Sequence, residues 1–359
     1  MNDSNTIPEL DRFFTPENPL LTNDEAELVS SISGLVIMHD RLRAAREVVR
    51  HALGENKVLS EARHTLVLGD AGCGKTTLLD SIRNEMPPAD DQFRLGTQRR
   101  QPLLEVSLPG AITPLSLAQY MLRALGYHKN LTGTCYKLTE ELKDQIRSCE
   151  VELIWLDEFQ HLLSLGKGTK RGASRRLTEA CNWIKGIIND TKVSFVLMGT
   201  PETEAIVTHD TQIERRFTHL ATLEAFPPPS IESTELVDFV DELLLETVQL
   251  PWFDSADFLF ERPVDAKRLW VCSEGIPSRI KDLLIRAALH AKRRDSRLIS
   301  MVDFTAAFGQ TRQKRVDFEA ARARRAERRT LLQALEQQKL NPFAANDDVI
   351  NALVRKMWA

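Results

Sequence analysis

Short, mostly apolar runs alternate with stretches of helical spacing along the first two thirds of this chain. The runs occupy residues 65–68, 103–108, 151–156 and 193–198. Near-continuous runs of this kind are typical of strands in a parallel sheet that is covered on both faces. Around them, apolar residues recur at helical spacing, from Met38 to Leu53 and from Leu115 to Leu125. The pattern therefore predicts an α/β fold in which helices flank a parallel sheet.

The pattern changes after Phe226, where three consecutive prolines can continue neither a helix nor a central strand. Helical spacing alone follows over residues 231–248, 264–272 and 278–294. We therefore expect residues 34–226 to form the α/β domain and residues 227–300 to form a small all-helical lid. Residues 301–340 are expected to form a basic helical extension.

The two ends of the chain carry weaker patterns. Residues 1–33 are polar and contain prolines, which predicts an N-terminal arm over the surface. Residues 341–359 combine a break at Pro342, a short acidic spot and a last apolar turn with Ile350, Leu353 and Trp358. Such a tail is typical of a disordered segment or of a peptide that docks on a partner.

The first apolar run leads into a glycine-rich loop that reads Gly-Asp-Ala-Gly-Cys-Gly-Lys-Thr over residues 69–76. A strand, this loop and a helix in succession form a P-loop, whose backbone N–H groups point at an anion beside a helix N-terminus. Lys75 would reach the β- and γ-phosphates, and the Thr76 hydroxyl would ligate magnesium. The loop predicts binding of ATP with Mg²⁺, with the nucleotide held by Gly69, Asp70, Ala71, Gly72, Cys73, Gly74, Lys75, Thr76 and Thr77.

Asp157 and Glu158 end the third apolar run abruptly. Ligand sites in open α/β sheets lie outside the carboxyl ends of the strands, so both carboxylates should face the P-loop phosphates. We expect Asp157 in the magnesium shell and Glu158 polarising the attacking water. Thr200, at the end of the fourth run, is expected to hold that water; the alternative is a helix cap before Pro201.

Arginines at two further positions are candidates for contacts with nucleotide. One of the pair Arg215 and Arg216 is expected to reach the nucleotide of a neighbouring subunit and to neutralise charge as the γ-phosphate departs. Arg279 follows a Gly-Ile-Pro-Ser break at the start of a predicted helix, where it could touch a nucleotide phosphate.

Charge limits where the chain can contact nucleic acid. A net charge of −4 over 359 residues excludes a uniformly basic coat, so any DNA-contacting surface must be local. The first candidate is a glycine-containing basic segment, expected as a mobile loop leading into a helix: Lys167, Lys170, Arg171, Arg175 and Arg176. It contacts the phosphate backbone or is a solvated face. Two other candidates are the trio Arg94, Arg99 and Arg100 and the basic stretch within residues 312–329, which binds nucleic acid or is a solvated helix.

Cysteine spacing and hydropathy exclude several other classes. The five cysteines are scattered without a C-x-x-C pair, which argues against a disulfide framework and a zinc site and for a reducing compartment. No apolar run approaches the roughly 18 residues of a membrane span, and the N-terminus lacks the layout of a signal peptide. We expect a cytoplasmic protein without a membrane partner.

Three stretches together carry a resemblance to a known family. They are the P-loop, the run Leu-Asp-Glu-Phe-Gln-His-Leu-Leu over residues 156–163, and the later strand end at residues 198–202 followed by Arg215-Arg216-Phe217. With them, the chain resembles the AAA+ ATPases and, more narrowly, the TniB/TnsC family of transposition regulators. The resemblance extends over residues 30–300 and implies a P-loop AAA+ parallel sheet with a helical lid.

Residue by residue, the resemblance implies that residues 69–77 hold nucleotide and that Asp157 and Glu158 serve magnesium and hydrolysis. It makes Thr200 the first sensor and Arg216 the finger supplied between subunits, with Arg215 as the alternative. Arg279 matches a second sensor only loosely, because this motif varies within the family.

The resemblance also implies a function. Such bacterial proteins form ATP-dependent rings or filaments of their own copies around duplex DNA, receive a TniQ-type target-selection protein and recruit transposase subunits. The expectation is therefore an ATPase, completed between subunits, that regulates transposition and disassembles on hydrolysis. The alternatives are a helicase loader or initiator ATPase of the same superfamily, and a nucleotide-gated protein scaffold with incidental DNA contact.

Overall fold

A computed structural model describes residues 21–59, 61–88, 100–110, 112–127, 131–162, 170–208, 210–310 and 347–358. The chain divides into two compact units. One is an α/β unit over residues 38–225, and the other combines the residues up to 37 with those from 226 onward. No helix among the described residues is long and apolar enough to cross a bilayer.

The α/β unit is built on a five-stranded sheet of β1 (Thr65–Gly69), β2 (Leu103–Ser107), β3 (Leu153–Asp157), β4 (Ser194–Gly199) and β5 (His219–Leu223). The strand order is β2-β3-β4-β1-β5, and every neighbouring pair is parallel. Ser107 lies opposite Asp157, and Leu68 lies opposite Gly199, so the carboxyl ends of the strands share one edge. The predicted parallel sheet is confirmed.

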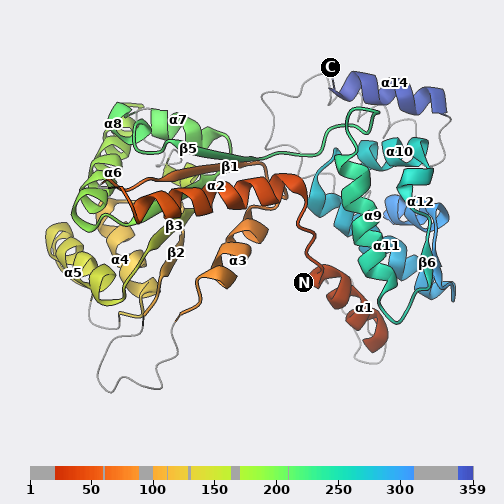
Figure 1. Cartoon of the computed structure of the whole chain (residues 1–359), viewed down its shortest axis with the longest axis horizontal. Coiled ribbons are helices and arrows are strands. Elements are labelled where there is room, and N and C mark those ends of the chain that lie inside the picture. The colour runs from red at the N-terminus through yellow and green to blue at the C-terminus, as the bar shows by residue number, and fades with distance from the viewer. Residues whose placement is uncertain are drawn as a thin grey trace, which may run out of the picture. The chain divides into compact units, whose positions relative to one another are not determined.

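Helices and one 3-10 turn surround this sheet (Figure 1). They are α2 (Asp40–Asn56), α3 (Lys75–Glu85), α4 (Pro114–Ala124), α5 (Cys135–Ser148), η2 (Phe159–Leu162), α6 (Lys170–Thr191), α7 (Glu202–Thr208) and α8 (Thr211–Glu214). Helix α4 begins as its sequence predicts, because Pro114 occupies the first turn and Thr113 and Ser116 form a reciprocal capping box.

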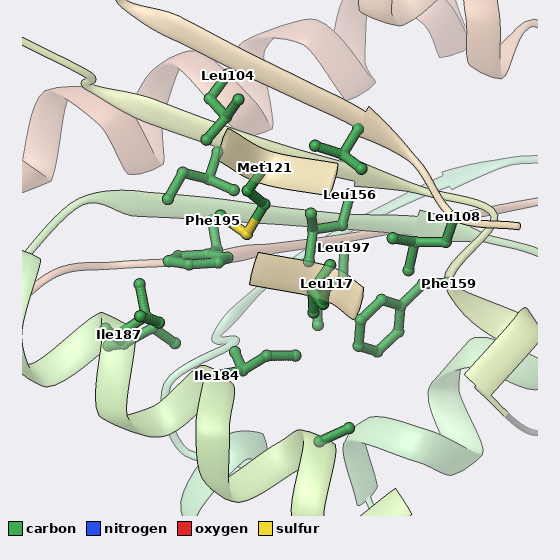
Figure 2. Close-up of a cluster of buried hydrophobic side chains, with 14 of the residues drawn as sticks. Leu104, Leu108, Leu117, Met121, Leu156, Phe159, Ile184, Ile187, Phe195 and Leu197 are labelled. Atoms are coloured by element: carbon green, nitrogen blue, oxygen red, sulfur yellow. The ribbon is translucent and has the colours of Figure 1, made fainter. Parts of the chain in front are cut away.

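Both faces of the central strands β3, β4 and β1 are buried, which explains their near-continuous apolar runs. On one face, alternate strand residues such as Leu156 and Phe195 pack with Met121 of α4 and Ile184 of α6 (Figure 2). The strand residues that alternate with these point to the opposite face, and Trp155 is fully buried there. Helix α2 packs on that face against β1, β4 and β5. Each fully buried Leu, Ile or Phe contributes about 1.5–3 kcal/mol, so this two-sided core holds the central strands and their helices together.

The second unit is mainly helical. It contains α1 (Asn23–Gly34), α9 (Glu235–Val248), η3 (Leu259–Glu261), α10 (Pro263–Ser273), α11 (Pro277–Arg293), α12 (Met301–Gln310) and α14 (Asp347–Trp358). A pair of two-residue parallel strands, β6 (Ser255–Ala256) and β7 (Leu298–Ile299), joins the loops between them. The described helices α9, α10 and α11 correspond to the three helical stretches of the sequence pattern.

Both ends of the chain include a helix that packs into this second unit, where the sequence pattern predicts an arm and a tail. Helix α1 starts with a capping box of Thr22 and Glu25, and it buries Leu28 among the helical core. Helix α14 buries Ile350, and Trp358 packs edge-to-face on Trp270 of α10 with ring centroids 5.9 Å apart. The last apolar turn therefore contacts the same chain. The basic stretch at 312–329 lies outside the described residues.

Candidate nucleotide-binding site

The P-loop curls because its glycines adopt a conformation that other residues disfavour. Gly72 and Gly74 have φ angles of 83° and 97°, in the left-handed region. Helix α3 begins directly afterward, and the Gly74 carbonyl accepts the first helical hydrogen bond from Leu78 N–H (2.9 Å). The remaining N–H groups of the first helical turn thus stay directed into the loop, as anion binding requires.

Lys75 and Gly69 fix the loop to the end of β1. The Lys75 ammonium donates to the Gly69 carbonyl (2.7 Å) and to the Asp70 carbonyl (3.1 Å), so its charge lies within the curl of the loop. A Cβ atom at Gly69 would lie 2.7 Å from the Leu223 carbonyl of β5, a distance that real contacts do not reach. Glycine is therefore required where this strand turns into the loop.

Asp157 ends β3 beside this lysine. Burial raises the pKa of the Asp157 carboxyl, and the charge of Glu158 adds to that effect, whereas the charge of Lys75 lowers the pKa. The Asp157 Oδ1 accepts a hydrogen bond from the Glu158 N–H (2.7 Å). A nearby cation stabilises the ionised form of a carboxylate whose pKa burial has raised. Carboxylate and hydroxyl oxygens are also the ligands that Mg²⁺ prefers. Asp157 and the Thr76 hydroxyl therefore fit a magnesium ion.

Glu158 stands in a strained turn that the surrounding structure holds. Its φ angle is 56°, a left-handed conformation that costs a non-glycine residue about 1–3 kcal/mol and recurs at functional sites. The turn is tied to the end of β2 twice: Leu108 N–H donates to the Asp157 carbonyl (3.0 Å), and His161 Nδ1 lies 2.7 Å from the Leu108 carbonyl. Phe159, between them, is buried in the core (Figure 2). The packing thus offsets the strain.

Gln160 links this turn to the end of β4, a contact that the sequence analysis did not assign. Its Nε2 donates to Glu158 Oε2, and its Oε1 accepts from the Thr200 N–H (3.2 Å). The Thr200 hydroxyl makes no hydrogen bond to α7 among the described residues, whereas the Thr200 carbonyl accepts one from the Thr203 N–H (2.8 Å) at the start of that helix. The sequence signal available for Gln160 was its place two residues after Glu158.

Arg215 and Arg216 follow α8, immediately before β5. The Arg216 carbonyl accepts a hydrogen bond from His64 N–H (3.3 Å), which fixes the backbone here. Neither guanidinium forms an ion pair or hydrogen bond with any residue in the described ranges. Arg279 belongs to the helical unit, where its Nη1 lies 2.9 Å from Glu274 Oε1.

The candidate DNA-contacting residues are described only in part. Arg100 forms two ion pairs, with Glu150 (2.9 Å) and Glu152 (2.7 Å), so its charge is already compensated. Helix α6 starts at Lys170, which places Arg171, Arg175 and Arg176 on its first turns rather than in a loop. Lys167, Arg94 and Arg99 lie outside the described residues.

Another group of side chains has the atoms to ligate a cation, away from the P-loop. His51 and Glu55 of α2 and His219 of β5 offer ligand atoms within 4.8 Å of one another. Two imidazoles do not suit Mg²⁺, which prefers oxygen, and Arg63 lies 3.8 Å from the Glu55 carboxylate. The group is therefore not the magnesium site expected beside the phosphates.

The α/β unit matches a known protein family. The model of the bacterial TniB protein family matches residues 34–225, more than half of the 359-residue chain. A search of curated protein sequences gives no match.

Solved structures resemble the chain at low sequence identity. The ORC2 protein of Aeropyrum pernix, in ADPNP-ADP complexes, matches with a TM-score of 0.53 and 14% identity, over 89% of this chain and 79% of that chain. Cdc6p from Pyrobaculum aerophilum matches with 0.51 and 12%, over 77% and 70%. Drosophila ORC bound to DNA matches with 0.50 and 12%, over 99% and 82%. The likeness shows that the chain has an AAA+ fold.

Proposed function

The chain belongs to the TniB family, and from this premise we propose that it is an ATP-dependent, DNA-binding regulator of transposition. It assembles on duplex target DNA when ATP is bound, links target selection to transposase recruitment and disassembles when ATP is hydrolysed. The observation that carries the proposal is the meeting of Lys75, Asp157 and Glu158 at one edge of the sheet. A lysine-bearing anion loop beside two carboxylates suits the hydrolysis of a nucleoside triphosphate.

Each of these side chains has its own part in the conversion of ATP and water to ADP and phosphate. The P-loop N–H groups and the Lys75 ammonium bind the phosphates. Thr76 and Asp157 would hold Mg²⁺, which when bound offsets phosphate charge. Glu158 orients and polarises the attacking water, and Thr200 holds that water from the neighbouring strand end.

Hydrolysis is completed between subunits in this proposal. The guanidinium of Arg216, or of Arg215 beside it, reaches the nucleotide of a neighbouring copy and stabilises the departing phosphate. Support comes from their uncompensated charges within the described ranges. Because a single copy then lacks one catalytic group, nucleotide turnover depends on assembly. ATP at about 100 times its dissociation constant contributes about 2.7 kcal/mol per site to the bound form, which is ample to control assembly.

The partners follow from the family rather than from contacts. Duplex DNA and further copies of this chain are the first, and the DNA-bound Drosophila ORC and nucleotide-bound Aeropyrum ORC2 are consistent with such partners for this fold. Transposase subunits and a TniQ-type target-selection protein are the others. The basic segment from Lys167 to Arg176 is the proposed contact to the phosphate backbone.

The proposal predicts opposite effects for two substitutions. Lys75→Ala removes the phosphate-binding ammonium, so we expect loss of ATP-dependent assembly on duplex DNA. Glu158→Gln leaves binding intact but slows hydrolysis by about 100-fold or more, so we expect an assembled state that stays on DNA. Sedimentation and DNA dissociation kinetics with ATP and Mg²⁺ measure both effects. Lys137→Ala, at an exposed position on α5, is the matched control and should behave like the unmodified protein.

Two results would contradict the proposal. A DNA residence time unchanged by Glu158→Gln would remove hydrolysis as the release step. A protein that stays monomeric with ATP, Mg²⁺ and duplex DNA all present would remove assembly itself.

An initiator or helicase-loader ATPase is the second candidate, favoured by the likeness to Cdc6p and ORC structures. It predicts a stable complex with a replicative helicase. Affinity capture with the purified transposase and the purified helicase of the same bacterium, each with ATP, distinguishes the two candidates.

A further inference from the structure

We propose that Gln160 is a positioning residue that couples the hydrolytic carboxylate of Glu158 to the end of strand β4. The inference rests on the proposed ATPase function and adds a residue to which that function assigned no role. Gln160 does not reach the phosphates in this role; it acts through Glu158.

The contacts of Gln160 are directional. Thr200 N–H can only donate, so the oxygen of the Gln160 amide must face it, at 3.2 Å. The amide nitrogen then faces Glu158 Oε2, and an ionised carboxylate can only accept. Both contacts are satisfied by one orientation of the amide, and the flipped orientation would oppose like groups at both ends. The side chain is therefore locked between two strand ends.

Gly199 leaves the space that this arrangement needs. A Cβ atom there would overlap both Gln160 Oε1 and Thr203 Oγ1. The last residue of β4 must therefore be glycine for the amide to lie against the strand. Phe159 and His161 hold the turn on either side, and Gln160 is the one of these three described residues whose side chain is hydrogen-bonded to the end of β4.

A mechanical consequence follows from the shared amide. A ligand phosphate that draws the Thr200 end of β4 toward it moves the N–H to which Gln160 is bonded. The amide transmits that movement to the side chain of Glu158, whose backbone is held in a left-handed conformation (φ 56°). Gln160 thus makes the orientation of the water-polarising carboxylate depend on what Thr200 contacts.

The test replaces Gln160 with an isostere that keeps one contact and breaks the other. In Gln160→Glu, a carboxylate oxygen still accepts from Thr200 N–H, but an ionised carboxylate faces Glu158 and repels it. We expect kcat for ATP hydrolysis to fall about 10- to 100-fold at pH 8 with KM for ATP unchanged, because misplacement of a reacting group by about 1 Å costs up to 100-fold.

Gln160→Met, of similar length but without hydrogen bonds, loses both contacts and should lower kcat with KM for ATP unchanged. Gly199→Ala displaces the amide from outside and should slow hydrolysis with Gln160 intact.

Thermal melting and binding of a fluorescent ATP analogue establish that each variant is folded and binds nucleotide. If the unmodified protein hydrolyses ATP and Gln160→Glu matches its kcat, this inference is wrong while the proposed function stands. If the unmodified protein with duplex DNA hydrolyses no ATP, the proposed function fails and takes the inference with it. A Gln160 variant with a raised KM for ATP and an unchanged kcat would assign Gln160 to nucleotide binding. That result would also overturn the inference.

Discussion

His64, just before β1, shows how one buried residue constrains the α/β unit. It is fully buried, and its ring packs with Phe195 and Phe217. Its Nδ1 accepts a hydrogen bond from the Phe195 N–H (3.1 Å), so Nε2 carries the proton of the neutral ring. Burial, and then the charges of Arg216 and Arg63, lower the pKa of His64 to about 3. The fold therefore favours the neutral imidazole.

This residue predicts acid sensitivity. The unfolded chain protonates His64 near pH 6.5, whereas the folded chain does so only near pH 3. The stability that the neutral His64 ring provides is fully present above its unfolded-state pKa of 6.5. It falls by about 1.4 kcal/mol per pH unit as the pH drops from there toward 3. His64→Asn keeps an acceptor near Phe195 but does not titrate there. We expect a lower free energy of unfolding at pH 7 and a smaller loss between pH 6.5 and 5.

Urea unfolding at the two pH values measures this difference. His51→Asn, at an exposed position on α2, is the control and should keep the slope of the unmodified protein. Equal slopes for His64→Asn and the unmodified protein would show that another group causes the acid sensitivity.

At the scale of elements, one carboxylate joins helices α11 and α12. Asp303, which is fully buried, accepts hydrogen bonds from Arg294 Nε (2.7 Å) and Nη2 (2.8 Å) and from the Ser300 N–H (2.8 Å). His290 Nδ1 lies 2.7 Å from the same carboxylate. Burial raises the pKa of Asp303, but the hydrogen bonds from Arg294, His290 and Ser300 outweigh it and hold the pKa at about 2.

Removing this charge should destabilise the helical unit. Asp303→Asn leaves Arg294 without its carboxylate partner and weakens the contacts of residue 303 with Ser300 at the start of α12. We expect the free energy of unfolding to fall by about 2–4 kcal/mol at pH 7. The stability that the Asp303 carboxylate provides is present above its unfolded-state pKa of about 3.8 and disappears as the pH falls through 2. The stabilities of the variant and of the unmodified protein should therefore converge in acid. Thermal melting measured by circular dichroism tests both points. Asp282→Asn, at an exposed position on α11, should change the melting temperature little.

At the scale of the whole molecule, the family-defining part coincides with one compact unit. The TniB match ends at residue 225, where the α/β unit of residues 38–225 also ends. The P-loop, Asp157, Glu158, Thr200 and the Arg215–Arg216 pair all lie within it. With a net charge of −4, the chain must use a local basic surface if it binds DNA.

Salt dependence tests where that surface lies. Neutralising the cations of the segment 167–176 should weaken binding to duplexes of unrelated sequence alike. Each lost phosphate contact should reduce the slope of log affinity against log salt by about 0.9. Fluorescence anisotropy over a salt series measures the slope, and Lys137→Ala is the control. An unaltered slope would assign the contact to Arg94, Arg99 and Arg100 or to the basic stretch at 312–329.

Several features of the fold were predictable because their causes are local. Parallel strands covered on both faces are almost wholly apolar, so β1, β3 and β4 stand out in the sequence, and β2 does so despite Glu105. The P-loop needs glycine at left-handed positions and a lysine at a fixed spacing, and Asp157 and Glu158 interrupt an apolar run. Strand β5 escaped detection because it is an edge strand whose residues alternate between exposed and buried.

The sequence alone therefore determined the α/β class, the anion loop and the carboxylate pair, since each depends on residues that are neighbours along the chain. Only the tertiary structure decided that the ends of the chain pack as α1 and α14, that Phe195 is the partner of His64, and that Gln160 joins Glu158 to a strand end 40 residues away. Such contacts depend on which surfaces meet when the chain folds, and no local pattern encodes the partner of a single hydrogen-bonding group.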